Sequence, residues 1–146
     1  MAVFARPANM RFASLHLSSL LLDERYRRTR LRSAFIFYAL ILVLGSVPGA
    51  RQKIGELASG GVLHAMAYGG ITLLLFTGFA GTGLRNACMA VATVVWMGAL
   101  DETVQSFFPY RSATVSDWLV DIAASAITAV VLWRWWPQRG LPSIRR

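Results

Sequence analysis

Residues 62–80 read VLHAMAYGGITLLLFTGFA, and this stretch decides the class of the protein. It lies within a longer segment that has no Asp, Glu, Lys or Arg between Glu56 and Arg85. About 20 predominantly apolar residues in a helix cross the roughly 30 Å hydrocarbon core of a bilayer. The stretch therefore predicts a transmembrane helix.

Three further apolar blocks predict three further spans. Residues 31–47 follow a run of arginines and stop at Pro48-Gly49, which is typical of a helix end. Residues 86–100 carry no charge, and we expect their helix to continue to Phe108. Residues 115–136 end in a tryptophan cluster that is typical of a membrane interface. The sequence thus predicts an all-α integral membrane bundle of about four transmembrane helices.

Composition agrees with this class and excludes others. The 146 residues are 55% hydrophobic, yet 15 Lys and Arg against seven Asp and Glu give a net charge of +8. Such a basic balance in a soluble protein would suggest nucleic acid, but the apolar blocks exclude that partner and favour membrane lipids. The single cysteine, Cys88, excludes an intrachain disulfide and a cysteine-based metal cluster.

The basic residues also predict the topology. With the N-terminus inside, 12 of the 15 Lys and Arg fall on the cytoplasmic side, and only Arg51, Lys53 and Arg111 fall outside. Because Lys and Arg near span ends favour the cytoplasm, we expect both termini there. The expected location is the cytoplasmic (inner) membrane of a bacterium, with several passes.

The chain divides into three parts. Residues 1–30 form a basic cytoplasmic segment, residues 31–136 the membrane domain, and residues 137–146 a basic cytoplasmic tail. Met10 to Leu22 has the apolar character of a signal peptide, but no small-residue cleavage site follows it. An interfacial amphipathic helix and a disordered tail remain equal alternatives for the N-terminal segment.

Polar side chains gather at one depth of the predicted bundle. Successive spans run in opposite directions, so the start of the second, the end of the third and the start of the fourth meet on the outer side. A carboxylate facing lipid at mid-membrane costs about 2.5 to 3.5 kcal/mol, so these side chains should face inward. The candidate pocket consists of His64, Tyr68, Asp101, Glu102, Gln105, Arg111, Asp117 and Asp121.

Several of these residues also have purely structural explanations. Thr114-x-x-Asp117 is a capping-box pattern, which makes Thr114 a helix cap, and Asp117 and Asp121 favour a helix N-terminus. Asp101 and Glu102 lie where negative charge is unfavourable, so we expect Arg111 to pair with one of them. Tyr68 and Gln105 suit packing and interhelical hydrogen bonds better than chemistry.

The sequence resembles the VanZ-like family of small bacterial membrane proteins over residues 45–133. The resemblance implies an envelope context, because the family is named for a member associated with low-level teicoplanin resistance, while its biochemical activity is generally unassigned. It implies a polar signature at His64, Glu102, Gln105, Arg111 and Asp117. The motifs that carry it are His64-x-x-x-Tyr68, Asp101-Glu102-x-x-Gln105-x-Phe107-x-Pro109-x-Arg111 and Thr114-x-x-Asp117.

Three functions remain open from the sequence. The first is a binding protein whose outer pocket engages an amphiphilic envelope component, such as a lipid headgroup or a lipid-linked or lipid-tailed glycopeptide. The second is a membrane enzyme in which His64 and a carboxylate perform acid/base chemistry. The third is a scaffold whose ionic cluster only sets helix register. The carboxylates with His64 could also hold a divalent cation, but their spacing favours no metal site, and the sequence names no cofactor.

Overall fold

The structure is a computed structural model that describes residues 20–21, 23–48, 59–110 and 114–136. Within these ranges the chain is helical and contains no strand. The elements are a 3-10 helix η1 (Glu24–Tyr26) and the α-helices α2 (Arg27–Ser46), α4 (Gly60–Gly78), α5 (Gly83–Ser106) and α6 (Val115–Trp135).

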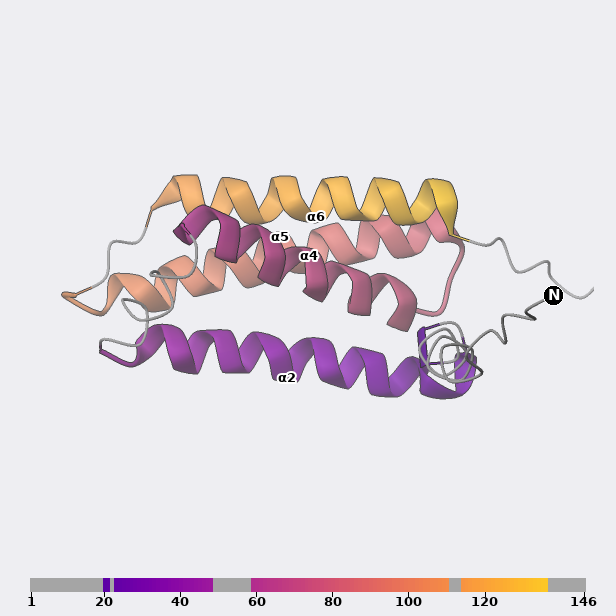
Figure 1. Cartoon of the computed structure of the whole chain (residues 1–146), viewed down its shortest axis with the longest axis horizontal. Helices are drawn as coiled ribbons and strands as arrows, with labels where there is room; N and C mark the ends of the chain where they lie inside the picture. The colour runs from indigo at the N-terminus through magenta and orange to yellow at the C-terminus, as the bar shows by residue number, and fades with distance from the viewer. Residues whose placement is uncertain (1–19, 22, 49–58, 111–113, 137–146) are drawn as a thin grey trace, which may run out of the picture.

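Each of the four α-helices is long and apolar enough to cross a membrane. They lie side by side and alternate in direction along the chain (Figure 1). The predicted all-α architecture, with four helices long and apolar enough to span a membrane, is therefore confirmed, and these helices suggest a multi-pass membrane protein.

The helix boundaries follow from local caps. The hydroxyl of Thr114 accepts a hydrogen bond from the backbone N–H of Asp117 at 3.3 Å, which confirms the predicted cap of α6. Thr82 caps α5 in the same manner, so this helix begins at Gly83, three residues before the charge-free stretch 86–100. Helix α2 begins at Arg27, four residues before the apolar block, because the arginine run is itself helical.

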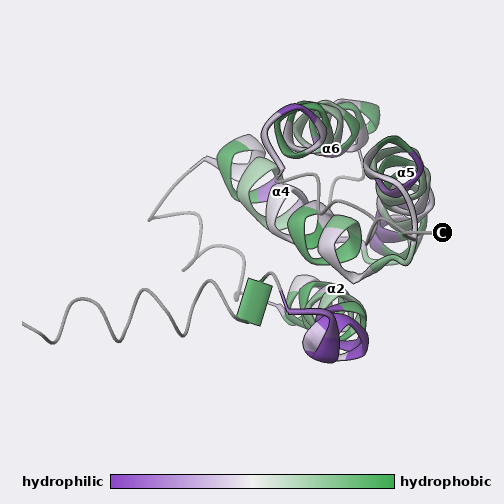
Figure 2. Ribbon diagram, turned by 90° about the vertical axis from the view of Figure 1, so that its right-hand side faces the viewer, coloured by the Kyte–Doolittle hydropathy of each residue, from purple (hydrophilic) through white to green (hydrophobic). Residues whose placement is uncertain are grey.

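Helix α4 occupies the centre of the packing. It contacts α2, α5 and α6, whereas α2 packs mainly on α4 and more lightly on α5 (Figure 2). Its residues Tyr68, Ile71, Leu75 and Phe76 are buried in the core. The charge-free stretch 62–80 thus forms most of the helix that contacts each of the other three.

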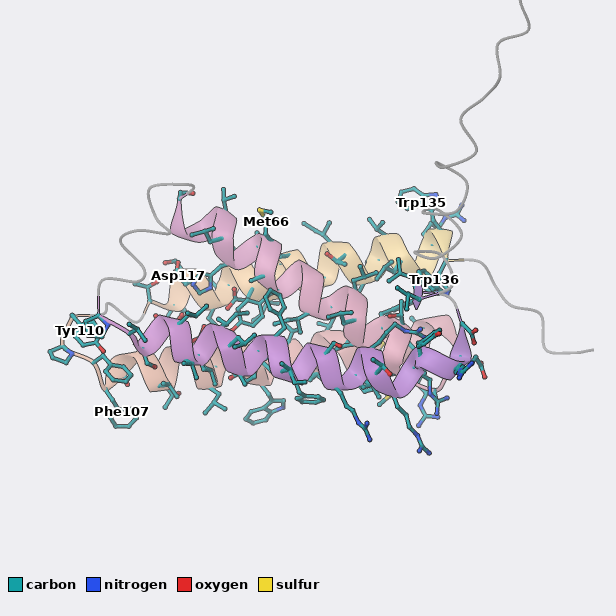
Figure 3. The ribbon with its side chains drawn as sticks, turned by 60° about the horizontal axis from the view of Figure 1, so that its bottom comes forward. Met66, Phe107, Tyr110, Asp117, Trp135 and Trp136 are labelled. Atoms are coloured by element: carbon teal, nitrogen blue, oxygen red, sulfur yellow. The ribbon has the colours of Figure 1, made fainter. Side chains whose placement is uncertain are left out.

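The molecule buries polar side chains and exposes apolar ones. Thr72 and Ser125 are completely buried, whereas Ile36, Met66 and Trp96 are exposed. Figure 3 shows Met66 on the outside of α4, pointing away from the bundle. This distribution is the reverse of what a water-soluble bundle requires and suits helices surrounded by lipid.

The two ends of the bundle differ in charge. We call the end where α2 and α5 begin and α4 and α6 end the arginine end. The opposite end, which holds Asp101, Glu102, Asp117 and Asp121, is the carboxylate end. Figure 3 shows Asp117 and Tyr110 toward one end, and Trp135 and Trp136 at the other. All Lys and Arg that the structure describes belong to the arginine end.

A buried arginine connects the helices at the arginine end. Arg30 Nε and Nη2 donate to the carbonyl of Thr77 at 3.1 and 2.8 Å. Its Nη1 donates to the carbonyls of Leu20 and Asp23 at 2.7 and 2.9 Å. The last carbonyls of a helix have no partner within it, so Arg30 supplies the missing donors for α4.

Two small features allow this contact. A Cβ on Gly78 would lie 2.6 Å from Cγ of Leu31, so only glycine lets α2 approach α4 this closely. Asn86 Nδ2 donates to the carbonyls of Phe76 and Phe79 at 3.1 and 3.0 Å, which satisfies further groups at the same helix end. From the sequence, Arg30 is interpreted only as one of the basic residues that set the topology, and its hydrogen bonds to other segments are not predicted.

Candidate functional site

A histidine–aspartate pair connects α4 to α6 at the carboxylate end. His64 Nδ1 lies 2.9 Å from Oδ1 of Asp121, whose side chain is fully buried, while that of His64 is 13% exposed. An ionised carboxylate can only accept, so Nδ1 is the donor, and in the neutral ring Nε2 is left as an acceptor. The pair places a basic nitrogen at the edge of the bundle interior.

A tyrosine–aspartate pair lies directly beside it. The hydroxyl of Tyr68 donates to Oδ2 of Asp101 at 3.1 Å, which connects α4 to α5, and both side chains are buried. The rings of His64 and Tyr68 are stacked, with centroids 6.0 Å apart and an interplanar angle of 16°. The two pairs therefore form one layer across α4, α5 and α6.

A third polar pair continues this layer toward the middle of the bundle. Thr72 Oγ1 lies 2.8 Å from Oγ of Ser125 and 2.7 Å from the carbonyl oxygen of Tyr68, so the two hydroxyls form a hydrogen-bonded pair next to the α4 backbone. His64, Tyr68 and Thr72 follow one another at intervals of four residues and so share a face of α4. One turn further, Leu75 and Phe76 are buried and apolar, so the polar column ends inside the core.

Glu102 connects α5 to the start of α6. Its Oε2 accepts a hydrogen bond from the backbone N–H of Thr114 at 2.7 Å. Its other oxygen, Oε1, is buried and has no hydrogen-bond partner in the described part of the chain. The same holds for Oδ2 of Asp121 and Oε1 of Gln105. The carboxylate end therefore holds three buried acceptors that the described residues leave unsatisfied.

A cavity of about 260 Å³ opens beside Glu102, between α5 and α6. Glu102 and Thr114 form its polar wall, and Ala99, Val115 and Trp118 form its apolar wall. The indole N–H of Trp118 donates to the carbonyl of Val95 at 3.0 Å, which fixes the ring. The Glu102 carboxylate thus lies beside a rigid apolar surface, and its buried Oε1 has no hydrogen-bond partner among the described residues.

Gly98 sets the spacing of the helices behind this cavity. A Cβ at this position would lie 2.8 Å from Cδ1 of Trp118 and 3.1 Å from Oδ2 of Asp121. No larger residue fits without displacing Trp118 or the Asp121 carboxylate. The width of the site therefore depends on a glycine that faces α6.

The structure brings most of the predicted residues together. Tyr68, Asp101, Gln105 and Asp121 are buried at the carboxylate end, and His64 forms its hydrogen bond there. Glu102 and Asp117 are partly buried. Arg111 lies outside the described residues, and so does its predicted pairing with Asp101 or Glu102.

Some residues of the site carry no sequence signal of their own. Trp118 and Gly98 read as ordinary members of apolar helices, and Ser125 as a tolerated small residue. Only the four-residue spacing of Asp117, Asp121 and Ser125 could have indicated that the polar face of α6 continues inward. Tyr38 of α2, whose hydroxyl donates to the carbonyl of Met97 at 2.9 Å, is also absent from the sequence argument.

The described residues include no group of three or more His, Cys, Asp or Glu side chains that could hold a metal ion. Three carboxylates of the site form hydrogen bonds to three different partners. Asp121 bonds to His64, Asp101 to Tyr68, and Glu102 to the Thr114 amide. What the arrangement can do is accept hydrogen bonds from a ligand and exchange a proton at His64.

No protein-family model, no curated protein and no solved structure matches this chain.

Proposed function

We propose that this chain is a VanZ-like protein of the bacterial inner membrane that binds an amphiphilic component of the cell envelope at its carboxylate end. The observation that carries the proposal is Oε1 of Glu102, which is buried without a described partner beside the cavity between α5 and α6. A buried polar atom without a partner costs about 1 to 3 kcal/mol, so a donor that reaches it gains binding free energy.

The chemistry of the cavity selects the class of ligand. The charged side chain on its wall is the Glu102 carboxylate, which accepts hydrogen bonds when ionised, so the ligand must offer donors: the hydroxyl, amide or amine groups of a sugar or peptide headgroup. Leu100, Val115 and Leu119 are exposed on the same two helices, where an acyl or prenyl tail can lie. A lipid-linked or lipid-tailed glycopeptide combines both parts, which would link the protein to glycopeptide susceptibility.

The proposal includes the orientation of the bundle. We place the arginine end and both termini in the cytoplasm and the carboxylate end outside, because all described Lys and Arg gather at one end. In a Cys88→Ser background, an impermeant thiol reagent should label Ser112→Cys in whole cells and spare Ser143→Cys. The reverse pattern would turn the site toward the cytoplasm.

The binding test uses Glu102→Gln. The new amide can keep its oxygen on the Thr114 N–H, which places NH₂ where Oε1 stands and turns an acceptor into a donor. We expect binding of teicoplanin by the detergent-solubilised protein to weaken about tenfold, since roughly 1.4 kcal/mol is a factor of ten. The melting temperature should be unchanged.

Two controls define the result. Glu24→Gln removes an exposed carboxylate at the arginine end and should leave binding unchanged. A glycopeptide without a lipid tail should bind more weakly than teicoplanin if the tail contributes. Loss of stability in step with loss of binding in Glu102→Gln, His64→Ala and Asp117→Asn would favour the scaffold function instead.

A second candidate is a membrane enzyme, which the His64–Asp121 pair favours. The buried carboxylate holds the ring by Nδ1, and this leaves Nε2 to accept a proton from a bound hydroxyl or water. His64→Gln should then abolish turnover of a lipid-linked substrate while teicoplanin still binds. This candidate would be excluded if the parent protein turned over no lipid-linked phosphate or acyl substrate and His64→Gln left teicoplanin binding unchanged.

A further inference from the structure

A second binding surface lies at the arginine end, on the outward face of α2. A groove of about 510 Å³ is bounded by Arg28, Leu31, Arg32, Phe35 and Ile36. Phe35 and Ile36 are exposed, as are both arginines. The groove therefore combines exposed apolar and basic side chains of α2, and Leu31 connects it to the bundle core.

The two groove arginines differ from their neighbour Arg30. Arg30 is buried and engages backbone carbonyls of other segments, whereas Arg28 and Arg32 have no hydrogen bond or ion pair within the described residues. They are four residues apart, which places them on one face of the helix about 6 Å apart along its axis. Two guanidinium groups at this spacing can hold one phosphate between them, and Arg offers paired donors for that purpose.

We propose that an anionic phospholipid binds here, with its phosphate between Arg28 and Arg32 and an acyl chain along the groove beside Phe35 and Ile36. The occupant follows from charge complementarity and from the direction of the apolar surface. The site is separate from the cavity at Glu102 and does not depend on the function proposed for it.

The row of exposed apolar side chains that continues from the groove along α2 is long enough for one leaflet of a bilayer. Below the arginines, α2 exposes Ile36, Leu40, Val43 and Val47, spaced by four, three and four residues along one face. At 1.5 Å per residue, the half-thickness of about 15 Å of the hydrocarbon core corresponds to roughly ten residues. A chain anchored at Arg32 therefore stays on this face as far as about residue 42.

The test compares two double variants that remove the same charge. Arg28→Gln/Arg32→Gln alters the groove, and Arg85→Gln/Arg134→Gln removes two exposed arginines of α5 and α6 at the same end. Delipidated full-length protein in detergent is titrated with dioleoylphosphatidylglycerol or dioleoylphosphatidylcholine, and bound lipid is counted by native mass spectrometry.

We expect the groove variant to bind phosphatidylglycerol at least about tenfold more weakly than the parent protein, and the matched variant less than twofold. Phosphatidylcholine binding should change in neither. Arg28→Lys/Arg32→Lys, which keeps the charge and loses paired donors, should fall between. Unchanged melting temperatures in lipid-free detergent show that the variants are folded.

Three results would overturn the proposal. Equal weakening in both double variants would show general attraction to a basic surface, and no weakening in the groove variant would show that the arginines bind no lipid. Full competition by glycerol 3-phosphate would show that the site takes a free phosphate group rather than a lipid. Competition should be absent, because this probe has no chain to fill the groove.

Discussion

The two ends of the bundle handle buried charge in opposite ways. At the arginine end, Arg30 donates to carbonyls of Thr77, Leu20 and Asp23, so its guanidinium is engaged by the end of α4 and by the chain before η1. At the carboxylate end, Asp121 and Glu102 each use one oxygen and leave the other unsatisfied by described residues. The buried charge at the first end holds segments of the chain together, whereas the buried carboxylates at the second keep acceptor oxygens that the described residues leave unsatisfied.

This comparison predicts that substitution of the buried Arg30 acts on stability, and that substitutions of the buried carboxylates separate stability from binding. Four predictions test the division, taken from the largest effect to the smallest.

Arg30→Gln should have the largest effect on stability. It removes charged donors from the buried carbonyl of Thr77 and from the partly buried carbonyls of Leu20 and Asp23, and one hydrogen bond to a charged group contributes about 1.5 to 3 kcal/mol. We expect a loss of about 3 kcal/mol in thermal or denaturant unfolding of the detergent-solubilised protein. The control is Arg32→Gln, an exposed neighbour that should change stability by less than about 0.5 kcal/mol. Equal effects would show that Arg30 is no anchor.

Asp121→Ala should cost about 2 kcal/mol, because His64 loses the partner of its Nδ1. Asp121→Asn keeps an acceptor oxygen at the same place and should recover most of that loss. The measurement is the same unfolding experiment, with teicoplanin binding measured beside it. If Asn destabilises as much as Ala, the carboxylate charge itself stabilises this end, and the contrast between the ends disappears.

Gly98→Ala should destabilise the protein by about 1.5 kcal/mol, since the added Cβ overlaps Trp118 and the Asp121 carboxylate. Binding at the cavity should weaken as well, because Trp118 forms one of its walls. Gly61→Ala is the matched control: nothing lies within 4 Å of its Cβ, so helix propensity should make this change neutral or slightly stabilising. A neutral Gly98→Ala would mean that α5 and α6 can separate freely.

Thr72→Val should have the smallest effect, about 0.6 kcal/mol, the average for an interhelical hydrogen bond in a membrane protein. A double-mutant cycle with Ser125→Ala isolates the bond between the two hydroxyls. Thr93→Val is the control, because the Thr93 hydroxyl bonds only to the carbonyl of Met89 in its own helix. A coupling energy near zero would show that the column below Tyr68 contributes packing alone.

Local sequence determined the spans and much of the candidate site. Hydropathy over about 20 residues is a local property, so α4 and its three partners follow from composition alone. The Thr114 cap is likewise a pattern of adjacent residues, confirmed by its bond to the Asp117 amide. Alternating helix direction then brought His64 and the carboxylates of α5 and α6 to one end, as the sequence predicted.

Only the tertiary structure decided which side chains meet. His64 bonds to Asp121, 57 residues away, and Arg30 to Thr77, 47 residues away. Such pairs depend on the rotation and approach of whole helices, which Gly78 and Gly98 permit by lacking a side chain. A charged residue within an apolar span must find a partner, but packing between distant segments determines which partner it finds. For this reason the sequence assigns Arg30 only to the topology, whereas the structure shows that it connects α2 to α4.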